Sequence, residues 1–330
     1  MELVIGGSGF IGSHIVRELL RRGKEVKVFD RCPFPPDEGV FPSETVLGDI
    51  LDPGMLRRAM HGCDTVFHLA GNPQLWDRNP QIFDQVNRRG TENVVRAARQ
   101  TNIRRLVYTS SETTLAPLHH NGPIVEETRT VLSDMIGPYC RSKFLAQQAV
   151  LQAAREGFPA VVVIPTLPIG PGDRNLTPPG RMILNFLQGK IPGYIDCTLN
   201  FVDVRDVALG HLFAADKGQP GGRYILSGHN LTLTEFFSYL SKVSGRPPPR
   251  IRVPYVVALA WSYIEELTGK LTGRVPRSSV TGVKLCKRSL AFDGRKTWEV
   301  LGHRPRRLEE SIRDTVLWHK GRMSRVDTMH

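Results

Sequence analysis

The sequence predicts an α/β fold with a doubly wound parallel sheet, and three observations support this prediction. Apolar stretches that suit strands alternate with segments of helical apolar spacing through the first half of the chain. A glycine-rich turn directly follows the first of these strands. The 330 residues, 40% hydrophobic and 23% charged, can bury a large core and are typical of a soluble globular protein. The alternation predicts helices on both faces of the sheet.

The first strand, a glycine turn and the first helix follow one another directly. Residues 3–5 suit a strand and residues 13–22 an amphipathic helix. Between them, Gly6, Gly9 and Gly12 allow a tight turn, a close approach of backbone to pyrophosphate and close packing of helix on strand. The amino terminus of the helix would face the phosphates. This order predicts a dinucleotide-binding Rossmann sheet.

The second strand, residues 25–29, ends at an acid that bears on the choice of cofactor. Asp30 stands eighteen residues past Gly12, near where a carboxylate commonly binds the ribose hydroxyls. Its charge would repel a ribose phosphate, which favours NAD. Arg31 follows at once, and a guanidinium there would suit the phosphate of NADP. We therefore expect NAD and keep NADP as the alternative.

The pattern of strand and helix then repeats. Further strands are expected at 45–47, 65–69 and 105–109, with helices at 55–60 and 83–100. The small pair Ala70-Gly71 ends one strand and would let a cofactor approach the backbone. Ser110-Ser111 ends another, where a doubly wound sheet places its chemistry, although serine also caps turns often.

A helix expected at 138–156 carries a tyrosine and a lysine four residues apart. Tyr139 and Lys143 can share one helical face. A phenol has a pKa near ~10, and a neighbouring ammonium lowers that value. A tyrosine so tuned can exchange a proton with an alcohol. The same spacing also occurs by chance on solvated helices, so spacing alone leaves both interpretations open.

The motifs have a recognisable order along the chain. They are residues 5–12, Asp49-Ile50, His68-Leu69-Ala70-Gly71, Asn87 with 90–93, Tyr108-Thr109-Ser110-Ser111, and Tyr139 with Lys143. In this order and spacing they resemble the extended short-chain dehydrogenase/reductase family over nearly the whole chain.

The resemblance implies roles for the matching residues. Tyr139 would be the general acid/base, Lys143 would lower its pKa and bind the nicotinamide ribose, and Ser111 would hold the substrate oxygen. Asp49 and Ile50 would flank adenine. The full set of expected cofactor contacts is Gly6, Ser8, Gly9, Phe10, Ile11, Gly12, Asp30, Arg31, Asp49, Ile50, Ala70, Gly71, Asn87, Tyr139, Lys143 and Pro165.

The resemblance also implies an interleaved second lobe. Residues 165–172 look like the family's loop into a substrate lobe, and 200–208 like the return. We expect an NAD(P)-binding domain at 1–165 with 198–228 returning to it, and a smaller C-terminal substrate-binding lobe at 166–197 and 229–330.

The branch of the family is indicated by segments 133–139, 177–181 and 200–202. They look most like bacterial proteins labelled hopanoid-associated sugar epimerases. They also resemble dihydroflavonol reductases and 3β-hydroxysteroid dehydrogenases, including sterol dehydrogenases acting at carbon 3. The expected substrate is a sterol or another terpenoid.

Charge and hydropathy in the second half suggest a surface for lipids. Residues 270–330 hold fifteen Lys and Arg against six Asp and Glu, which is +9 of a net charge of +12. Residues 253–264 are nearly all apolar but too few to cross a bilayer. They could rest on an anionic membrane or form a core helix of the substrate lobe. The basic residues could also be a solvated face, and without interleaved aromatics we expect no nucleic-acid partner.

The cysteines and the start of the chain indicate a compartment. Five cysteines are odd in number and widely spaced, which predicts reduced thiols and no metal site. A strand directly after the first Met leaves no room for a signal peptide. We expect a cytoplasmic protein and a homodimer, as is common in the resembling family, and keep peripheral contact with the inner face of a membrane as an alternative.

Three functions fit this sequence. The first is an NAD(P)-dependent oxidoreductase that interconverts a secondary alcohol and a ketone on a sterol or terpenoid. The second is a nucleotide-sugar epimerase or dehydratase that uses the same Ser-Tyr-Lys triad, with Arg174, Arg181, Lys190 and Arg205 as candidates for a diphosphate site. The third is a cofactor-dependent sensor without turnover, which the intact triad disfavours.

Overall fold

A seven-stranded sheet forms the centre of the computed structural model, which describes residues 1–36, 39, 41–120, 122–288 and 290–327. Its strand order is β10-β6-β5-β4-β1-β2-β3, and every neighbouring pair is parallel. The strands are β1 (Glu2–Ile5), β2 (Val26–Asp30), β3 (Glu44–Leu47), β4 (Thr65–His68), β5 (Arg105–Thr109), β6 (Ala160–Pro165) and β10 (Arg223–Leu226). The predicted doubly wound parallel sheet is confirmed.

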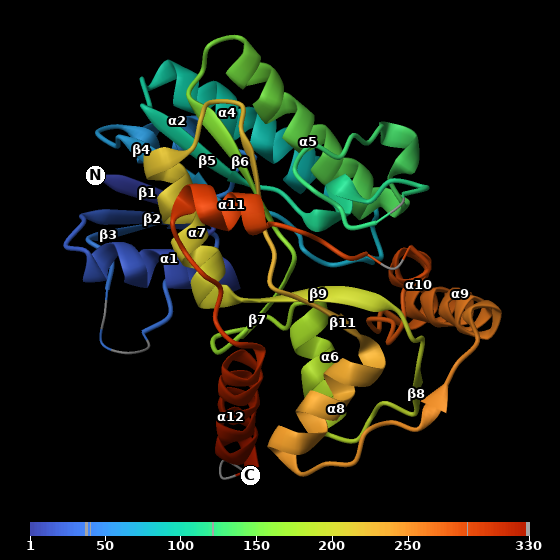
Figure 1. Cartoon of the computed structure of the whole chain (residues 1–330). Helices are drawn as coiled ribbons and strands as arrows, with labels where there is room; N and C mark the ends of the chain where they lie inside the picture. The colour runs from blue at the N-terminus through green and yellow to red at the C-terminus, as the bar shows by residue number, and fades with distance from the viewer. Residues whose placement is uncertain (37–38, 40, 121, 289, 328–330) are drawn as a thin grey trace.

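Helices cover both faces of this sheet (Figure 1). One layer holds α1 (Phe10–Arg21), α7 (Val204–Lys217) and α11 (Arg295–Leu301). The other holds α2 (Pro53–Met60), α4 (Gly90–Gln100) and α5 (Gly137–Arg155). Each layer has its own apolar core: Ile15 and Val207 are buried in the first, and Leu56, Val94 and Val150 in the second. The strands are apolar toward both sides because both faces are covered.

The helix expected at 83–100 has an irregular first half. It begins as α3 (Gln81–Phe83), continues as the π-helix η2 (Asp84–Arg89) and becomes α4 at Gly90. Short π-helical turns are rare and are frequent at functional sites. This one carries Asn87, one of the residues expected at the cofactor site.

A smaller unit packs below the large sheet (Figure 1). Its three-stranded sheet has the order β11-β9-β7, with α6, α8 and α12 beside it. These elements are β7 (Leu167–Ile169), β9 (Thr198–Asp203), β11 (His229–Thr232), α6 (Pro178–Leu187), α8 (Leu233–Ser244) and α12 (Leu308–Asp327). Phe201 and Phe236 stack in its core with ring centroids 3.9 Å apart. β9 pairs with β7 and β11, and α7, which follows it from Val204, packs on the large sheet.

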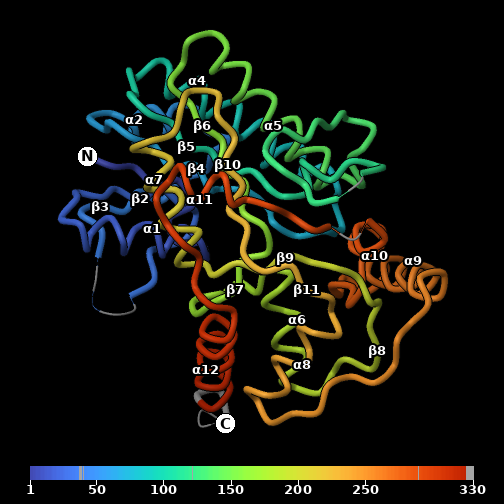
Figure 2. Tube along the Cα trace, in the orientation of Figure 1, coloured from blue at the N-terminus to red at the C-terminus, as the bar shows by residue number. Residues whose placement is uncertain are grey.

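The apolar segment 253–264 lies at the rim of the molecule (Figure 2). It forms most of the first part of α9 (Tyr255–Thr272), which follows a short ribbon of β8 (Gly193–Tyr194) and β12 (Ile251–Arg252) and precedes α10 (Val280–Cys286). Of the 18 residues of α9, Ala258, Ser262 and Gly269 are buried. The alternative of a core helix is therefore wrong.

A buried carboxylate ties the C-terminal part of the chain to α7. Asp206 is fully buried and accepts hydrogen bonds from the backbone N–H of Arg306 at 2.6 Å and from Nε2 of His303 at 3.0 Å. The guanidinium of Arg306 forms an ion pair with the same carboxylate. This carboxylate thus binds both a side chain and the backbone of the segment that leads into α12.

We predict that Asp206→Ala lowers the free energy of unfolding in urea by about 2 to 3 kcal/mol, because Arg306 and His303 lose their shared acceptor. Asp216→Ala, at an exposed position of the same helix, should change it by less than about 0.5 kcal/mol. Equal stability of the two variants would show that this carboxylate does not anchor the segment.

Candidate functional site

The candidate site lies at the carboxyl edge of the large sheet, where the strand order reverses between β1 and β4. Doubly wound sheets bind ligands in the crevice outside this point. Turns and helix starts at this edge carry most of the residues that the sequence predicted for the site. They are Gly6, Ser8, Gly9, Phe10, Ile11, Gly12, Asp30, Arg31, Asp49, Ile50, Ala70, Gly71, Ser111 and Pro165. Helices η2 and α5 add Asn87, Tyr139 and Lys143.

The glycine turn after β1 is too tight for side chains. Gly6 has a φ of +86°, and a Cβ on it would lie 2.6 Å from the backbone nitrogen of Ala70. A Cβ on Gly12 would lie 2.1 Å from the Gly6 carbonyl oxygen, which also accepts the Gly9 N–H at 3.1 Å. No side chain of the described residues caps the helix that starts at Phe10, and its first turn has no acid. These features fit a pyrophosphate held by backbone N–H groups.

Asp30 places its carboxylate beside this turn. One oxygen accepts the backbone N–H of Ser8 at 3.0 Å, and the other accepts the N–H of Cys32 at 3.2 Å. The Ser8 hydroxyl donates to the carbonyl of Cys32 at 2.9 Å, so both strand ends are linked. Arg31, between them, is exposed. The carboxylate thus has a fixed position next to the turn, whereas the guanidinium is at the surface.

Three further residues predicted to contact the cofactor lie directly after β3 or at the end of β6. Asp49 accepts the backbone N–H of Leu51 at 2.9 Å and so shapes the turn after β3. Ile50 is buried against Gly90, where a Cβ would lie 2.4 Å from its Cδ1. Pro165 is buried as the last residue of β6. The packing of Ile50 requires a glycine at the start of α4.

Asn87 connects the turn after β4 to the helix that carries Tyr139. Its Oδ1 accepts the backbone N–H of Asn72 at 2.7 Å, and its Nδ2 donates to the hydroxyl of Ser142 at 3.0 Å. A Cβ on Gly71 would lie 3.0 Å from the same Oδ1. Asn87 is itself buried, so its hydrogen bonds position α5 against the turn.

Tyr139 is buried at the start of α5, close to Ser111, whose hydroxyl lies 3.0 Å from that of Thr113. Its ring meets that of Phe83 edge to face, with centroids 6.1 Å apart. Burial raises the pKa of Tyr139 above its usual value, and the neighbouring Ser111 hydroxyl opposes that rise only in part. The phenol therefore holds its proton at neutral pH.

Lys143 is also buried, one turn further along α5. Its Nζ donates to the carbonyl of Thr109 at 2.7 Å and lies 4.8 Å from the ring centroid of Tyr108. Burial lowers the pKa of Lys143 to about 7. We expected the ammonium to lower the pKa of Tyr139, but in this structure burial raises it instead. The reason is that the lysine is directed to β5.

Two buried residues beside the triad escaped the sequence analysis. Glu112 directly follows Ser111, and burial raises the pKa of its carboxyl to about 8. Gln147 accepts hydrogen bonds from the hydroxyls of Ser110 at 2.7 Å and Thr114 at 3.0 Å. Gln147 lies eight residues after Tyr139, so helical spacing could have indicated it. No local pattern marks Glu112.

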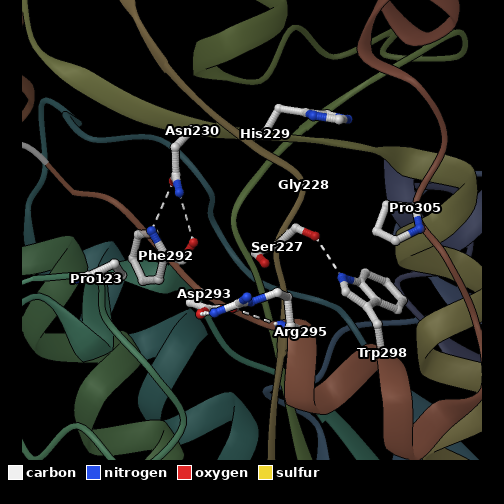
Figure 3. Close-up of a pocket in the computed structure, with 10 residues that line it drawn as sticks. All are labelled: Pro123, Ser227, Gly228, His229, Asn230, Phe292, Asp293, Arg295, Trp298 and Pro305. Carbon is white, nitrogen blue, oxygen red and sulfur yellow. Dashed lines mark hydrogen bonds and ion pairs between the residues drawn. The ribbon is translucent and has the colours of Figure 1, made fainter.

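A cavity of about 420 Å³ lies away from these residues, between the turn after β10 and α11 (Figure 3). Its polar groups are paired with one another. Trp298 Nε1 donates to the carbonyl of Ser227 at 2.7 Å, and Asn230 exchanges two hydrogen bonds of 2.9 Å with the backbone of Phe292. None of the residues predicted for the site lines it, and we interpret it as a seam between packed segments.

Comparison with known proteins matches residues 2–227 to the model of the NAD dependent epimerase/dehydratase family. A protein of Synechocystis named "Putative dihydroflavonol 4-reductase" is 36% identical over 320 residues, 96% of this chain and 93% of the relative. "Sterol demethylase protein B" of Methylococcus capsulatus is 28% identical over 97% of this chain and 98% of the relative. "3-beta-hydroxysteroid dehydrogenase" of Mycolicibacterium neoaurum is 32% identical over 273 residues, which are 76% of this chain and 72% of the relative.

A solved structure shares the whole fold. The crystal structure of gox2253 superposes with a TM-score of 0.84 at 32% identity and covers 98% of both chains. The relatives confirm the resemblance that the motifs predicted, and the glycine turn accommodates the cofactor of the family. The chain therefore belongs to the NAD-dependent epimerase/dehydratase family of extended short-chain dehydrogenases/reductases, and it is an NAD-dependent enzyme.

Proposed function

We propose that this enzyme interconverts a secondary alcohol and a ketone on a sterol or other terpenoid, as a 3β-hydroxysteroid dehydrogenase does. The observation that carries the proposal is the placement of the buried Tyr139 close to Ser111, with Lys143 one turn away. A buried phenol next to a hydroxyl suits a ketone oxygen, which needs one proton and one hydrogen-bond donor. The names of the relatives from Methylococcus and Mycolicibacterium support a sterol-type substrate.

The proposed roles follow from protonation states. In the reductive direction Tyr139 donates its proton to the carbonyl oxygen, while the Ser111 hydroxyl donates a hydrogen bond to the same oxygen. Bound NADH supplies the hydride for the carbonyl carbon. Lys143, with a pKa of about 7, can be charged or neutral near physiological pH. A charged Lys143 would stabilise the phenolate that remains after proton transfer.

We also propose which residues bind each part of the cofactor and which segments form each lobe. The glycine turn would hold the pyrophosphate, Asp30 the adenosine ribose, and Asp49 and Ile50 the adenine. The large sheet, which includes β10, would form the cofactor-binding part together with α7. Residues 166–203 and most of 229–330 would form the substrate lobe. Helix α11 lies within 229–330 but would belong to the cofactor-binding part, because it packs on α7. Following the family, we propose a cytoplasmic homodimer in peripheral contact with a membrane.

The alternative is a nucleotide-sugar epimerase or dehydratase, which the family model includes. Such a substrate needs cations for its diphosphate. Of the four candidates, Arg205 already pairs with Asp203 at 2.7 Å and Asp314 at 2.9 Å. These ion pairs make Arg205 a poor diphosphate ligand.

For the acid/base role, we predict that Tyr139→Phe lowers turnover of a 3β-hydroxysterol at least about 100-fold, because the proton donor is lost. NAD affinity should stay within about threefold of the wild-type value, since the ring is retained. Tyr239→Phe, in α8, is the matched control and should leave turnover unchanged. Turnover is measured by nicotinamide absorbance with product analysis, and a wild-type rate in Tyr139→Phe would refute the role.

For cofactor choice, we predict that Asp30→Asn raises affinity for NADP about tenfold relative to NAD, because a charge that repels the ribose phosphate is removed. The amide oxygen can still accept the N–H of Ser8, so the turn should persist. Arg31→Gln in the same background should reverse the gain. Fluorescence titration with both cofactors measures the ratio, and an unchanged ratio would remove Asp30 as its determinant.

The buried carboxyl of Glu112 makes stability depend on pH. Its pKa of about 8 in the folded protein exceeds the usual 4.5, so the folded state retains a proton that the unfolded chain releases. The free energy of unfolding should therefore fall as pH rises through this window, by up to about 1.4 kcal/mol per pH unit. We predict that Glu112→Gln lacks this loss and gains stability over wild type between about pH 5 and 8. For the control Glu25→Gln, at an exposed position, the free energy of unfolding should change with pH as it does in wild type. The same pH dependence in Glu112→Gln and wild type would show that the Glu112 carboxyl ionises in the folded protein as it does in the unfolded chain.

A further inference from the structure

The helix α9 faces the protein with small side chains and turns large apolar side chains outward. Its buried residues, Ala258, Ser262 and Gly269, lie on one side at the helical period. The opposite side carries apolar residues that are between 53 and 76% exposed: Val256, Val257, Trp261, Ile264, Leu267 and Leu271. Helices on the surface of globular proteins have the reverse arrangement, with the apolar side inward.

Both carboxylates of α9 are held away from this outward side. Glu265 accepts the backbone N–H of Arg277 at 3.0 Å, and Glu266 accepts that of Val280 at 2.8 Å. These hydrogen bonds tie the acids to the segment that leads into α10. The outward side of α9 therefore carries apolar side chains without negative charge.

Cations border the apolar side. Lys284 of α10 and Lys287, which directly follows this helix, place their ammonium groups 6.0 and 5.1 Å from the ring centroids of Tyr263 and Tyr255. Lys270 is exposed on α9 itself. From 252 to 288 the sequence has seven Lys and Arg against two Glu. Aromatic rings next to cations at an apolar edge suit the boundary between lipid headgroups and acyl chains.

The inner side of α9 and α10 packs against two segments near the proposed active site. A Cβ on Gly269 would lie 3.2 Å from the ring of Trp76, in the loop after β4. A Cβ on Gly137, where α5 begins, would lie 2.4 Å from the hydroxyl of Thr281 in α10. The pair of helices thus connects the exposed apolar side to the two segments that position Asn87 and Tyr139.

We propose that α9 docks on the surface of an anionic phospholipid membrane, with its axis in the plane of the surface. Among helices in the described ranges, none is long and apolar enough to span a bilayer. The apolar side chains would enter the acyl boundary while Lys270, Lys284 and Lys287 meet lipid phosphates. That this brings a membrane-dissolved substrate to the site rests on the proposed function, whereas lipid binding itself does not.

A second copy of the chain fits this surface less well. A two-fold contact through α9 would bring the same cations of both copies to one interface without facing carboxylates. Anionic headgroups supply the complementary charge that a second copy lacks.

Flotation of the purified full-length protein with vesicles tests the proposal, in the absence of substrate and cofactor. The protein should bind phosphatidylcholine vesicles that contain phosphatidylglycerol, bind pure phosphatidylcholine less, and be released by salt. The double variant Leu267→Glu/Leu271→Glu should reduce the bound fraction about tenfold. The control Val300→Glu/Leu317→Glu changes exposed apolar residues of α11 and α12 and should bind like wild type. Normal NAD binding by both variants would show that they are folded.

Two further measurements separate the outcomes. Brominated phospholipid should quench the fluorescence of Trp261, and Trp261→Phe should remove that quenching while vesicle binding persists. Sedimentation velocity detects a dimer through α9. Absence of vesicle binding, equal binding by the α9 double variant, or a wild-type dimer that the α9 variant converts to a monomer would each overturn the proposal. Because these experiments measure vesicle binding and not turnover, their outcome does not depend on whether the proposed substrate is correct.

Discussion

The buried ammonium of Lys143 is the constraint on which the site depends. Burying an ammonium is unfavourable unless hydrogen bonds and nearby electron density replace water. Here β5 supplies both, through the carbonyl of Thr109 and the ring of Tyr108. Because consecutive residues of one strand hold the amine, α5 can pack on the sheet in one register only. The hydrogen bond from Asn87 to Ser142, next to Lys143, holds the same register from the opposite side.

This register also decides which groups near the lysine are charged. Burial and the charge of Lys143 lower the pKa of His68, on the adjacent strand, to about 3. Burial raises the pKa of Tyr139 and of Glu112, so both retain their protons at neutral pH. At this edge of the sheet Tyr139 is a proton donor, while Lys143, with a pKa of about 7, and Glu112, with a pKa of about 8, can both change charge near neutrality.

Local patterns predicted much of the fold and part of the site. Gly6 and Gly12 sit within one strand-turn-helix, and Tyr139 and Lys143 within one helical turn, so short-range geometry was sufficient. The pairing of β9 with β7 and β11 is non-local, so no local pattern could have predicted it. The directions of the pKa shifts depend on burial, which no spacing encodes. For the same reason Glu112 was missed, although its position next to Ser111 is visible in the sequence.

The orientation of α9 shows why apolar periodicity is ambiguous. Hydrophobic spacing finds an apolar side but does not say whether protein covers it. In α9 the decisive residues are the small ones. Gly269 allows the helix to lie close to Trp76, and a side chain as large as Leu267 or Leu271 would push it away from that loop. Close packing of the small side therefore forces the large apolar side chains outward. Their exposure is a consequence of this packing, and an anionic membrane surface is the partner that we propose for them.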